Sequence, residues 1–159
     1  MQLAKYFGAE VTGVCSIKNL DLIKSLGADH TIDYTKEDFT KNGQKYDIIF
    51  DTLGKSRYSS SKKTLNEGGF YLLAVFGFRQ VFVMLWTSRA SSKKVICAVC
   101  SETIENLVFL RKLSESGEIK SVIDKSYALE EIREAHAYVE KGHKRGNVVI
   151  NIVDDTKYE

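Results

Sequence analysis

An alternation of short apolar runs with helical stretches constrains the fold of this chain more than any other feature. Runs rich in apolar and β-branched residues predict strands or extended segments at 10–15, 30–33, 46–52, 70–76, 95–99, 120–127 and 147–153. Helical composition and spacing predict helices at 2–7, 18–26, 35–39, 57–65, 101–116 and 129–140, whereas residues 77–94 show no clear pattern. Such alternation is typical of crossover units, so we expect an α/β fold with a mainly parallel sheet.

Bulk composition narrows the classes of partner. The chain has 159 residues, of which 43% are hydrophobic, enough for one sizeable core. Its formal net charge is only +2, with both signs spread along the sequence, and we therefore expect no nucleic-acid partner. The longest apolar run, 81–86, is far too short to span a bilayer, so no membrane partner is expected. Three cysteines in apolar surroundings fit a reduced, cytoplasmic protein.

Five strings in the sequence together point to a known family. They are QLAKYFGAEVTGVCS from Gln2, SLGADHTIDY from Ser25, YDIIFDTLG from Tyr46, LNEGGFYLL from Leu65, and ALEEIREAHAYVEKGHKRGNVVI from Ala128. In their order and spacing they resemble the cofactor-binding portion of the medium-chain dehydrogenase/reductase superfamily, in its zinc-free, NADPH-dependent quinone oxidoreductase-like branch. The resemblance implies a Rossmann-like, doubly wound, mainly parallel sheet.

By the same resemblance, Met1 stands inside the helix that follows the family's glycine-rich loop. The sequence contains no GxGxxG, and Gly68-Gly69 opens a strand rather than a helix, so the usual first strand and phosphate loop are not found here. Residues 1–119 would form a truncated dinucleotide-binding domain, and 120–159 the segment that in the family returns to the catalytic domain. A fragment of a longer protein and a truncated gene product are both compatible with this pattern.

The missing strand would lie at the centre of the sheet. In the strand order 3-2-1-4-5-6 it separates the strands expected at 10–15 and 46–52. Since unpaired buried backbone groups are costly, we expect these two strands to pair directly or to borrow a strand from another copy.

The end of the strand 10–15 indicates the choice of cofactor. Enzymes that use NAD place a carboxylate there to bind the ribose hydroxyls, but Val14 to Lys18 contains none. A hydroxyl at Ser16 and an ammonium at Lys18 suit the 2′-phosphate of NADPH, and by resemblance Tyr34 lies beside the adenosine. Alternatively, Ser16 caps the next helix, Lys18 is a solvated residue and Tyr34 is an ordinary strand-end aromatic.

Ligands of open α/β sheets gather at the carboxyl ends of the strands, which adds further candidates. Thr52 and Gly54 follow the strand 46–52, where the family makes backbone contact with the adenosine, although Gly54 could equally be a turn glycine. Phe76-Gly77 and Cys100-Ser101 end the next two strands and would face the nicotinamide.

We predict no metal site and no catalytic residue within this chain. Cys97 and Cys100 have metal-like spacing but would point to opposite faces of a strand, and His30, His136 and His143 are scattered. Hydride transfer belongs to the cofactor, and the protein mainly orients it.

The resemblance implies an NADPH-dependent reductase of quinones or α,β-unsaturated carbonyls that is inactive in this form. The alternative is a non-catalytic module that folds and dimerises without tight cofactor binding; a methyltransferase-like Rossmann domain is disfavoured by Ser16 and Lys18. The apolar strand 95–99 would form an exposed edge, and in the family this edge joins two copies into a homodimer. Residues 81–86 would either shield that edge or take part in the contact.

Overall fold

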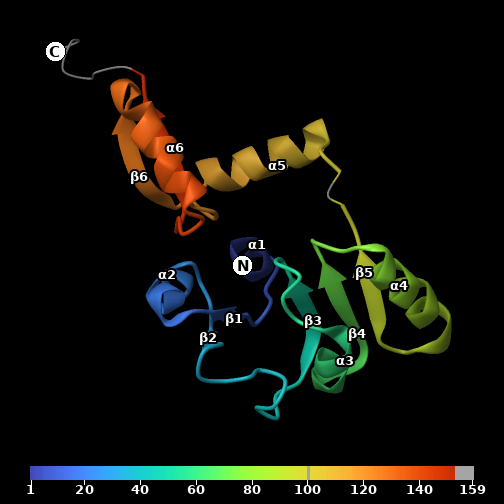
Figure 1. Cartoon of the computed structure of the whole chain (residues 1–159). Helices are drawn as coiled ribbons and strands as arrows, with labels where there is room; N and C mark the ends of the chain where they lie inside the picture. The colour runs from blue at the N-terminus through green and yellow to red at the C-terminus, as the bar shows by residue number, and fades with distance from the viewer. Residues whose placement is uncertain (100, 153–159) are drawn as a thin grey trace. The chain divides into compact units, whose positions relative to one another are not determined.

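The computed structural model describes residues 1–99 and 101–152 (Figure 1). The chain divides into two compact units, and each is described by itself. Unit 1 contains Met1–Val11, Asp21–Asp29 and the chain from Ile104, whereas unit 2 contains Thr12–Leu20 and His30–Thr103. The units therefore do not follow the boundary expected after residue 119, and the predicted division into two domains stays a prediction.

A three-stranded parallel sheet forms the centre of unit 2. Strands β3 (Tyr46–Asp51), β4 (Leu65–Leu73) and β5 (Lys94–Cys97) lie side by side in that order (Figure 1). The buried core consists of Leu65, Tyr71 and Leu73 of β4 with Val95 of β5. As the middle strand, β4 is paired on both edges and supplies most of this core.

Strand β4 begins five residues earlier than predicted. The sequence indicated a helix up to Leu65 and a tight turn at 66–69, but α3 (Tyr58–Ser61) and the 3-10 turn η2 (Lys62–Thr64) end before Leu65. The expected turn is an irregularity inside the strand instead, with Gly68 at φ +77°. A side chain at Gly69 would lie 2.9 Å from the carbonyl of Asn66, so this close approach requires glycine.

Helix α4 (Phe78–Ala90) occupies most of the stretch that the sequence left unassigned, and it lies along β5 (Figure 1). Two of its side chains accept hydrogen bonds from the backbone of β5. The N–H of Val95 donates to Thr87 Oγ1 at 3.1 Å, and the N–H of Cys97 donates to Met84 Sδ at 3.4 Å. The helix thereby shields this edge of the strand, which is one of the two roles expected for residues 81–86.

A second, two-stranded parallel ladder also belongs to unit 2. It joins β1 (Thr12–Cys15) to β2 (His30–Asp33), and the short 3-10 turn η1 (Ile17–Asn19) follows β1. No ladder joins β1 to β3 within the described residues, so the expected direct pairing of these strands is wrong for this chain. The apolar side chains on these strands are largely exposed, at 45% for Val14 and 60% for Phe50. Water can reach such edges and satisfy their backbone groups, so direct pairing is not required.

The helix predicted at 35–39 is also wrong. Asp33 Oδ1 accepts the backbone N–H of Thr35 at 3.0 Å, and Asp38 Oδ1 accepts that of Thr40 at 2.9 Å. Side-chain bonds of this kind compete with helical hydrogen bonds and favour turns. The segment therefore forms consecutive turns.

In unit 1, a parallel pair of strands is joined by a helix. The pair consists of β6 (Ile123–Ala128) and β7 (Asn147–Asn151), and η3 (Leu129–Glu131) with α6 (Ile132–Glu140) connects them. The other helices are α1 (Gln2–Tyr6), α5 (Ile104–Glu115) and nearly all of α2 (Leu20–Ser25).

Packing and one ion pair hold α1 in unit 1. The ring of Phe109 on α5 lies 6.0 Å from that of Tyr6 and 6.3 Å from that of Phe7. Lys5 Nζ lies 2.8 Å from the Asp29 carboxylate, which also accepts the N–H of Val11 at 2.7 Å.

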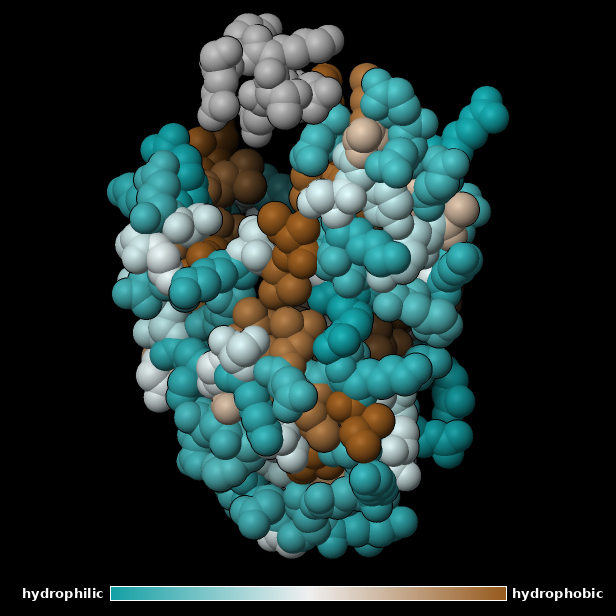
Figure 2. Space-filling view, turned by 90° about the vertical axis from the view of Figure 1, so that its left-hand side faces the viewer, coloured by the Kyte–Doolittle hydropathy of each residue, from teal (hydrophilic) through white to brown (hydrophobic). Residues whose placement is uncertain are grey.

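Every ladder in the described residues is parallel, which confirms the predicted α/β class. Apolar side chains nevertheless reach the surface, as the brown atoms in Figure 2 show on one face. Exposed large hydrophobic residues occur in both units, for example Phe7 and Ile104 in unit 1 and Phe78 and Phe82 in unit 2. Among the described residues no helix is both long and apolar enough to cross a membrane.

Candidate cofactor site

Three of the predicted cofactor residues lie at the carboxyl ends of β1 and β2. The N–H of Tyr34 donates to the carbonyl of Cys15 at 3.1 Å, which brings the two strand ends together. Ser16 has extended backbone geometry at the start of η1, and its side chain makes no capping hydrogen bond. The Lys18 side chain is exposed, as is Tyr34 at 63%. All three residues therefore follow the carboxyl ends of these two strands, and the expected alternative of a side-chain cap at Ser16 does not form.

A carboxylate that the sequence analysis did not consider lies beside this group. Asp33 ends β2 directly opposite Cys15 and is only 9% exposed. The hydroxyl and the backbone N–H of Thr35 hold the pKa of Asp33 below its usual range. Burial, followed by this charge, raises the pKa of the neighbouring Cys15 thiol.

The two oxygens of Asp33 are not offered to solvent. Oδ1 accepts two hydrogen bonds from Thr35, whereas Oδ2 is buried and has no hydrogen-bond partner. The side-chain oxygen of the nearby Asn19 is likewise buried without a partner. Asp33 therefore adds negative charge opposite Cys15, but its Oδ2 is buried and its Oδ1 is already engaged by Thr35.

Thr52 and Gly54 lie in the loop after β3, and a buried carboxylate organises this loop. Asp51 is 8% exposed and accepts backbone N–H bonds from Leu53 at 3.0 Å and from Ser56 at 2.8 Å. Burial pushes the pKa of Asp51 upward, but hydrogen bonds from Ser56, Leu53 and Lys55 outweigh it and leave the pKa below its usual value. The carboxylate is thus charged and fixed at neutral pH.

The hydroxyl groups of two side chains extend this network. Ser56 Oγ donates to Asp51 Oδ2 at 2.9 Å and lies 2.6 Å from the Tyr71 hydroxyl of β4. Tyr71 itself is buried in the core. The network therefore ties the loop after β3 to the central strand, and it holds Thr52 and Gly54 exposed at the strand end.

Gly54 requires its glycine. The reason is its φ of +65°, a conformation that other residues rarely adopt. The carbonyl of Val75 lies 3.5 Å from where a side chain would begin, which is an ordinary van der Waals distance. The loop after β3 therefore lies against the segment after β4, which contains Phe76 and Gly77. Both of the expected roles, a turn glycine and a backbone surface open to a ligand, remain compatible with this geometry.

The last two predicted residues are less available to a ligand. Phe76 is partly buried and packs against the core cluster. The N–H of Gly77 donates to Gln80 Oε1 at 3.0 Å as α4 begins. Ser101 is exposed, whereas Cys100 lies outside the described residues.

All seven predicted residues belong to unit 2, but they form two groups. Ser16, Lys18 and Tyr34 stand at the β1–β2 ladder, and Thr52, Gly54, Phe76 and Gly77 stand at the β3–β4–β5 sheet. No role was predicted from the sequence for Asp33, Asp51 or Ser56. The only available signal was an aspartate at the end of each strand, followed within a few residues by a hydroxyl side chain.

The described residues give no indication of a metal centre. Nowhere in 1–99 or 101–152 do three His, Cys, Asp or Glu side chains gather as metal ligands would. Cys97 is a free thiol paired with Leu73 in the β4–β5 ladder, and burial raises the pKa of Cys97.

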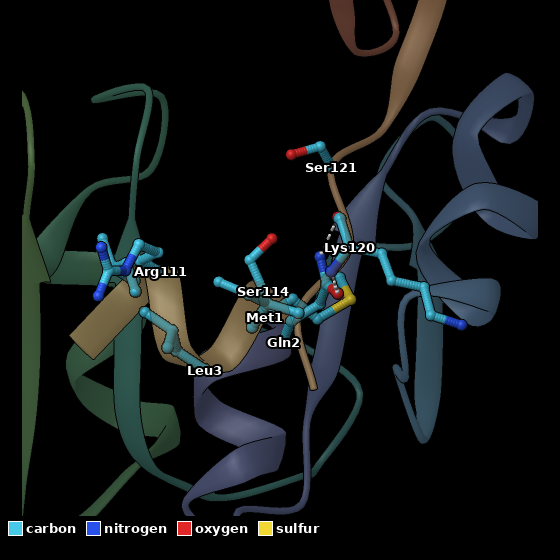
Figure 3. A pocket seen from close by; sticks show the side chains of 9 residues that line it. Met1, Gln2, Leu3, Arg111, Ser114, Lys120 and Ser121 are labelled. Carbon is cyan, nitrogen blue, oxygen red and sulfur yellow. Dashed lines mark hydrogen bonds between the residues drawn. The ribbon is translucent and has the colours of Figure 1, made fainter. Parts of the chain in front are cut away.

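A separate hollow of about 520 Å³ lies within unit 1, between α1, the end of α5 and the segment after it (Figure 3). Gln2 and Lys120 close one side: the backbone N–H of Lys120 donates to Gln2 Oε1 at 2.7 Å, and Gln2 Nε2 donates to the Lys120 carbonyl at 3.0 Å. Arg111 and Ser114 of α5 also line it. None of the predicted cofactor residues lies here.

Residues 26–150 match the family described as "Zinc-binding dehydrogenase". The chain belongs to this family. Within the medium-chain dehydrogenase/reductase superfamily it is quinone oxidoreductase-like, as the resemblance implied. The family's description mentions zinc, but the described residues contain no cluster of side chains that could bind it. The zinc-free assignment stays a prediction.

Two curated relatives of this zinc-binding dehydrogenase family member are named as oxidoreductases. The chain is 32% identical over 155 residues to the quinone-oxidoreductase QR1 of Triphysaria versicolor, covering 94% of this chain and 47% of the relative. It is 32% identical over 154 residues to the NADPH-dependent alkenal/one oxidoreductase of Arabidopsis thaliana, covering 94% and 36%. The chain thus spans about half or less of these relatives.

A solved structure confirms the fold. The quinone oxidoreductase from Coxiella burnetii superimposes with a TM-score of 0.77 at 28% identity, over 96% of this chain and 48% of the other. The arrangement of elements is therefore the Rossmann-like one of the family's cofactor-binding portion.

Proposed function

We propose that this chain forms the NADPH-binding portion of an oxidoreductase that reduces quinones or α,β-unsaturated carbonyls. The names of the relatives support the reaction class, since one is a quinone oxidoreductase and another an NADPH-dependent alkenal/one oxidoreductase. When bound, NADPH supplies the hydride. The residues of this chain would bind and orient it, without an acid or base of their own.

The preference for NADPH over NADH rests on the residues that follow the end of β1. Ser16 has an uncapped side chain and Lys18 an exposed one, and the nearby Asp33 carboxylate is closed off by Thr35 and by burial. A cofactor phosphate could therefore meet a hydroxyl and an ammonium there. The ribose hydroxyls of NADH would find no accessible carboxylate.

The second group of residues would support the rest of the cofactor. The loop that carries Thr52 and Gly54 is held by Asp51 and Ser56, so its backbone has a fixed form before any ligand arrives. Such preorganisation reduces the entropy lost on binding. The exposed Thr52 and Gly54 are the contacts proposed for the adenosine.

Titration of the purified chain with NADPH and NADH tests this proposal. We expect micromolar binding that favours NADPH, and replacement of Lys18 by Ala should weaken NADPH binding on the order of tenfold while leaving NADH binding unchanged. Lys24→Ala, which removes an exposed lysine of α2, is the matched control.

No binding at millimolar cofactor would instead favour the alternative, a module that folds without a cofactor. The separation of the predicted residues into two groups on separate ladders is the observation in favour of that alternative. We further propose that the chain alone is inactive, so that NADPH oxidation with a soluble quinone would not exceed the uncatalysed rate.

A homodimer in the cytoplasm remains part of the proposal. The free thiols of Cys15 and Cys97 suit a reducing compartment. Pairing through the β5 edge would have to accommodate α4, which already accepts two of the N–H groups of β5. Light scattering coupled to size-exclusion chromatography would refute the dimer if only monomer appeared at high concentration.

A further inference from the structure

Helix α4 has an inner face that packs and an outer face that does not. On the inner face, Val83 and Met84 pack against the core cluster, and Thr87 is fully buried. The outer face carries four large apolar side chains, which we call the outer stripe. Their exposed fractions are 88% for Phe78, 72% for Phe82, 48% for Leu85 and 58% for Trp86.

The spacing of the outer stripe makes it one continuous surface. Its residues stand at positions i, i+4, i+7 and i+8 of a 13-residue helix, and such positions share one side of an α-helix. Solvated helices normally place polar residues there. The outer stripe therefore presents apolar surface that the other described residues of unit 2 leave uncovered.

The charge around the outer stripe is of one sign. Arg79 and Arg89 are exposed on the same helix near its two ends, and the sequence has no acidic residue between Glu67 and Glu102. Lys62 Nζ lies 5.8 Å from the centre of the Trp86 ring. Glu67 is engaged by Lys93 at 3.3 Å, so it does not offset the arginines.

We propose that α4 docks on the surface of a bilayer that contains anionic phospholipids, with the outer stripe in the interface and the arginines at the headgroups. An amphipathic helix that combines Trp, Phe and Leu with flanking cations is typical of this mode. A second copy fits less well, because two outer stripes packed together would bring arginines near arginines with no acid between them. The expectation of no membrane partner rested on the lack of a spanning segment, which a helix lying in the interface does not need.

Vesicle binding by the purified chain tests the proposal, and Trp86 is a built-in reporter because it is the only tryptophan. The chain should float with vesicles of phosphatidylcholine and phosphatidylserine but not with phosphatidylcholine alone. Binding should shift the tryptophan emission to the blue, and added salt should weaken it. None of these readouts involves a cofactor, so their outcome is independent of the proposed reductase function.

Two double variants locate the contact. Phe78→Ser with Phe82→Ser should weaken vesicle binding about tenfold or more, because it removes two exposed apolar anchors. Its control is Leu107→Ser, which removes an apolar side chain that is 62% exposed on α5. Arg79→Glu with Arg89→Glu should abolish the preference for phosphatidylserine, with Arg133→Glu on α6 as the control. All four positions on α4 are exposed, and circular dichroism checks that the variants fold.

Three results would overturn the proposal. The first is an absence of binding to phosphatidylserine vesicles by the folded chain. The second is binding that the α4 variants and their controls alter equally. The third is a blue shift that depends on protein concentration without lipid, since it would mean that a second copy covers the outer stripe.

Discussion

Buried aspartates at strand ends determine the local form of the candidate site. Asp51 collects hydrogen bonds from Leu53, Lys55 and Ser56 and thereby fixes the loop that Gly54 makes possible. The sequence predicted the position of this loop at the carboxyl end of a strand. It could not predict the network, because the donors converge only once the loop has its particular backbone angles. The effect of Asp33 could not be predicted either. Asp33 ends β2, whereas Cys15, whose pKa it raises, ends β1, and only the folded ladder brings them together.

Replacing Asp51 by Asn should lower the free energy of unfolding at pH 7 by about 2 kcal/mol, because an amide accepts these hydrogen bonds less strongly and adds an unpaired donor. Urea denaturation followed by circular dichroism measures this. Asp47→Asn is the control, since Asp47 is solvent-accessible and accepts one exposed bond from Asn66. Equal losses in the two variants would contradict the role given to the network.

The difference between the wild type and Asp51→Asn should also depend on pH. The pKa of Asp51 is lowered in the folded state, so its stabilisation is fully present above the unfolded pKa of about 3.9 and is lost as pH falls through the folded value. The two unfolding curves should therefore differ most at neutral pH and converge in acid. A constant difference from neutral pH into acid would contradict this.

At the scale of elements, the sequence predicted most strands and missed one helix. Helix α4 carries apolar side chains on both its packed and its exposed sides, which removes the periodic contrast by which a surface helix is recognised. The opposite error occurred at 35–39, where helical composition gave way to turns held by Asp33 and Asp38. In both places a tertiary or side-chain interaction outweighed the local pattern.

The attachment of α4 to β5 gives a prediction for this element. Thr87→Val keeps the shape of the side chain but leaves the N–H of Val95 without its acceptor, so it should destabilise the chain by about 1–2 kcal/mol in urea denaturation. Ser88→Ala is the control, because the Ser88 hydroxyl only donates to the Leu85 carbonyl at the exposed side of the helix. A loss no larger than that of the control would mean that the bond to Val95 adds nothing.

For the whole molecule, the α/β class and the family were predictable, but the division into two compact units was not. Unit 1 unites the first residues of the chain with the segment after Ile104, through contacts such as Gln2 with Lys120 and Tyr6 with Phe109. Pairings this distant along the sequence leave no mark in local periodicity. For the same reason, local patterns could not reveal that β1 and β3 form no ladder with each other.

Because β1 and β3 each leave one edge unpaired, we expect the backbone amides of different strands to differ in their protection from hydrogen exchange. Hydrogen exchange followed by mass spectrometry should show the slowest exchange in β4, which has a ladder on each side, and faster exchange in β1 and β2, which form a ladder of only two strands. Equal protection of β1 and β4 would mean that another chain supplies the missing partner to β1 in solution.

Each ladder joins strands that are consecutive along the chain: β1 with β2, β3 with β4, β4 with β5, and β6 with β7. The paired residues of each ladder are 18 to 24 positions apart along the chain, so each pairing closes a single crossover and none depends on a more distant segment. Each ladder can therefore close as soon as its second strand has left the ribosome, and the β3–β4–β5 sheet does not have to wait for β6 and β7. Ribosome-bound chains that end some way beyond β5 should already resist proteolysis across β3–β5.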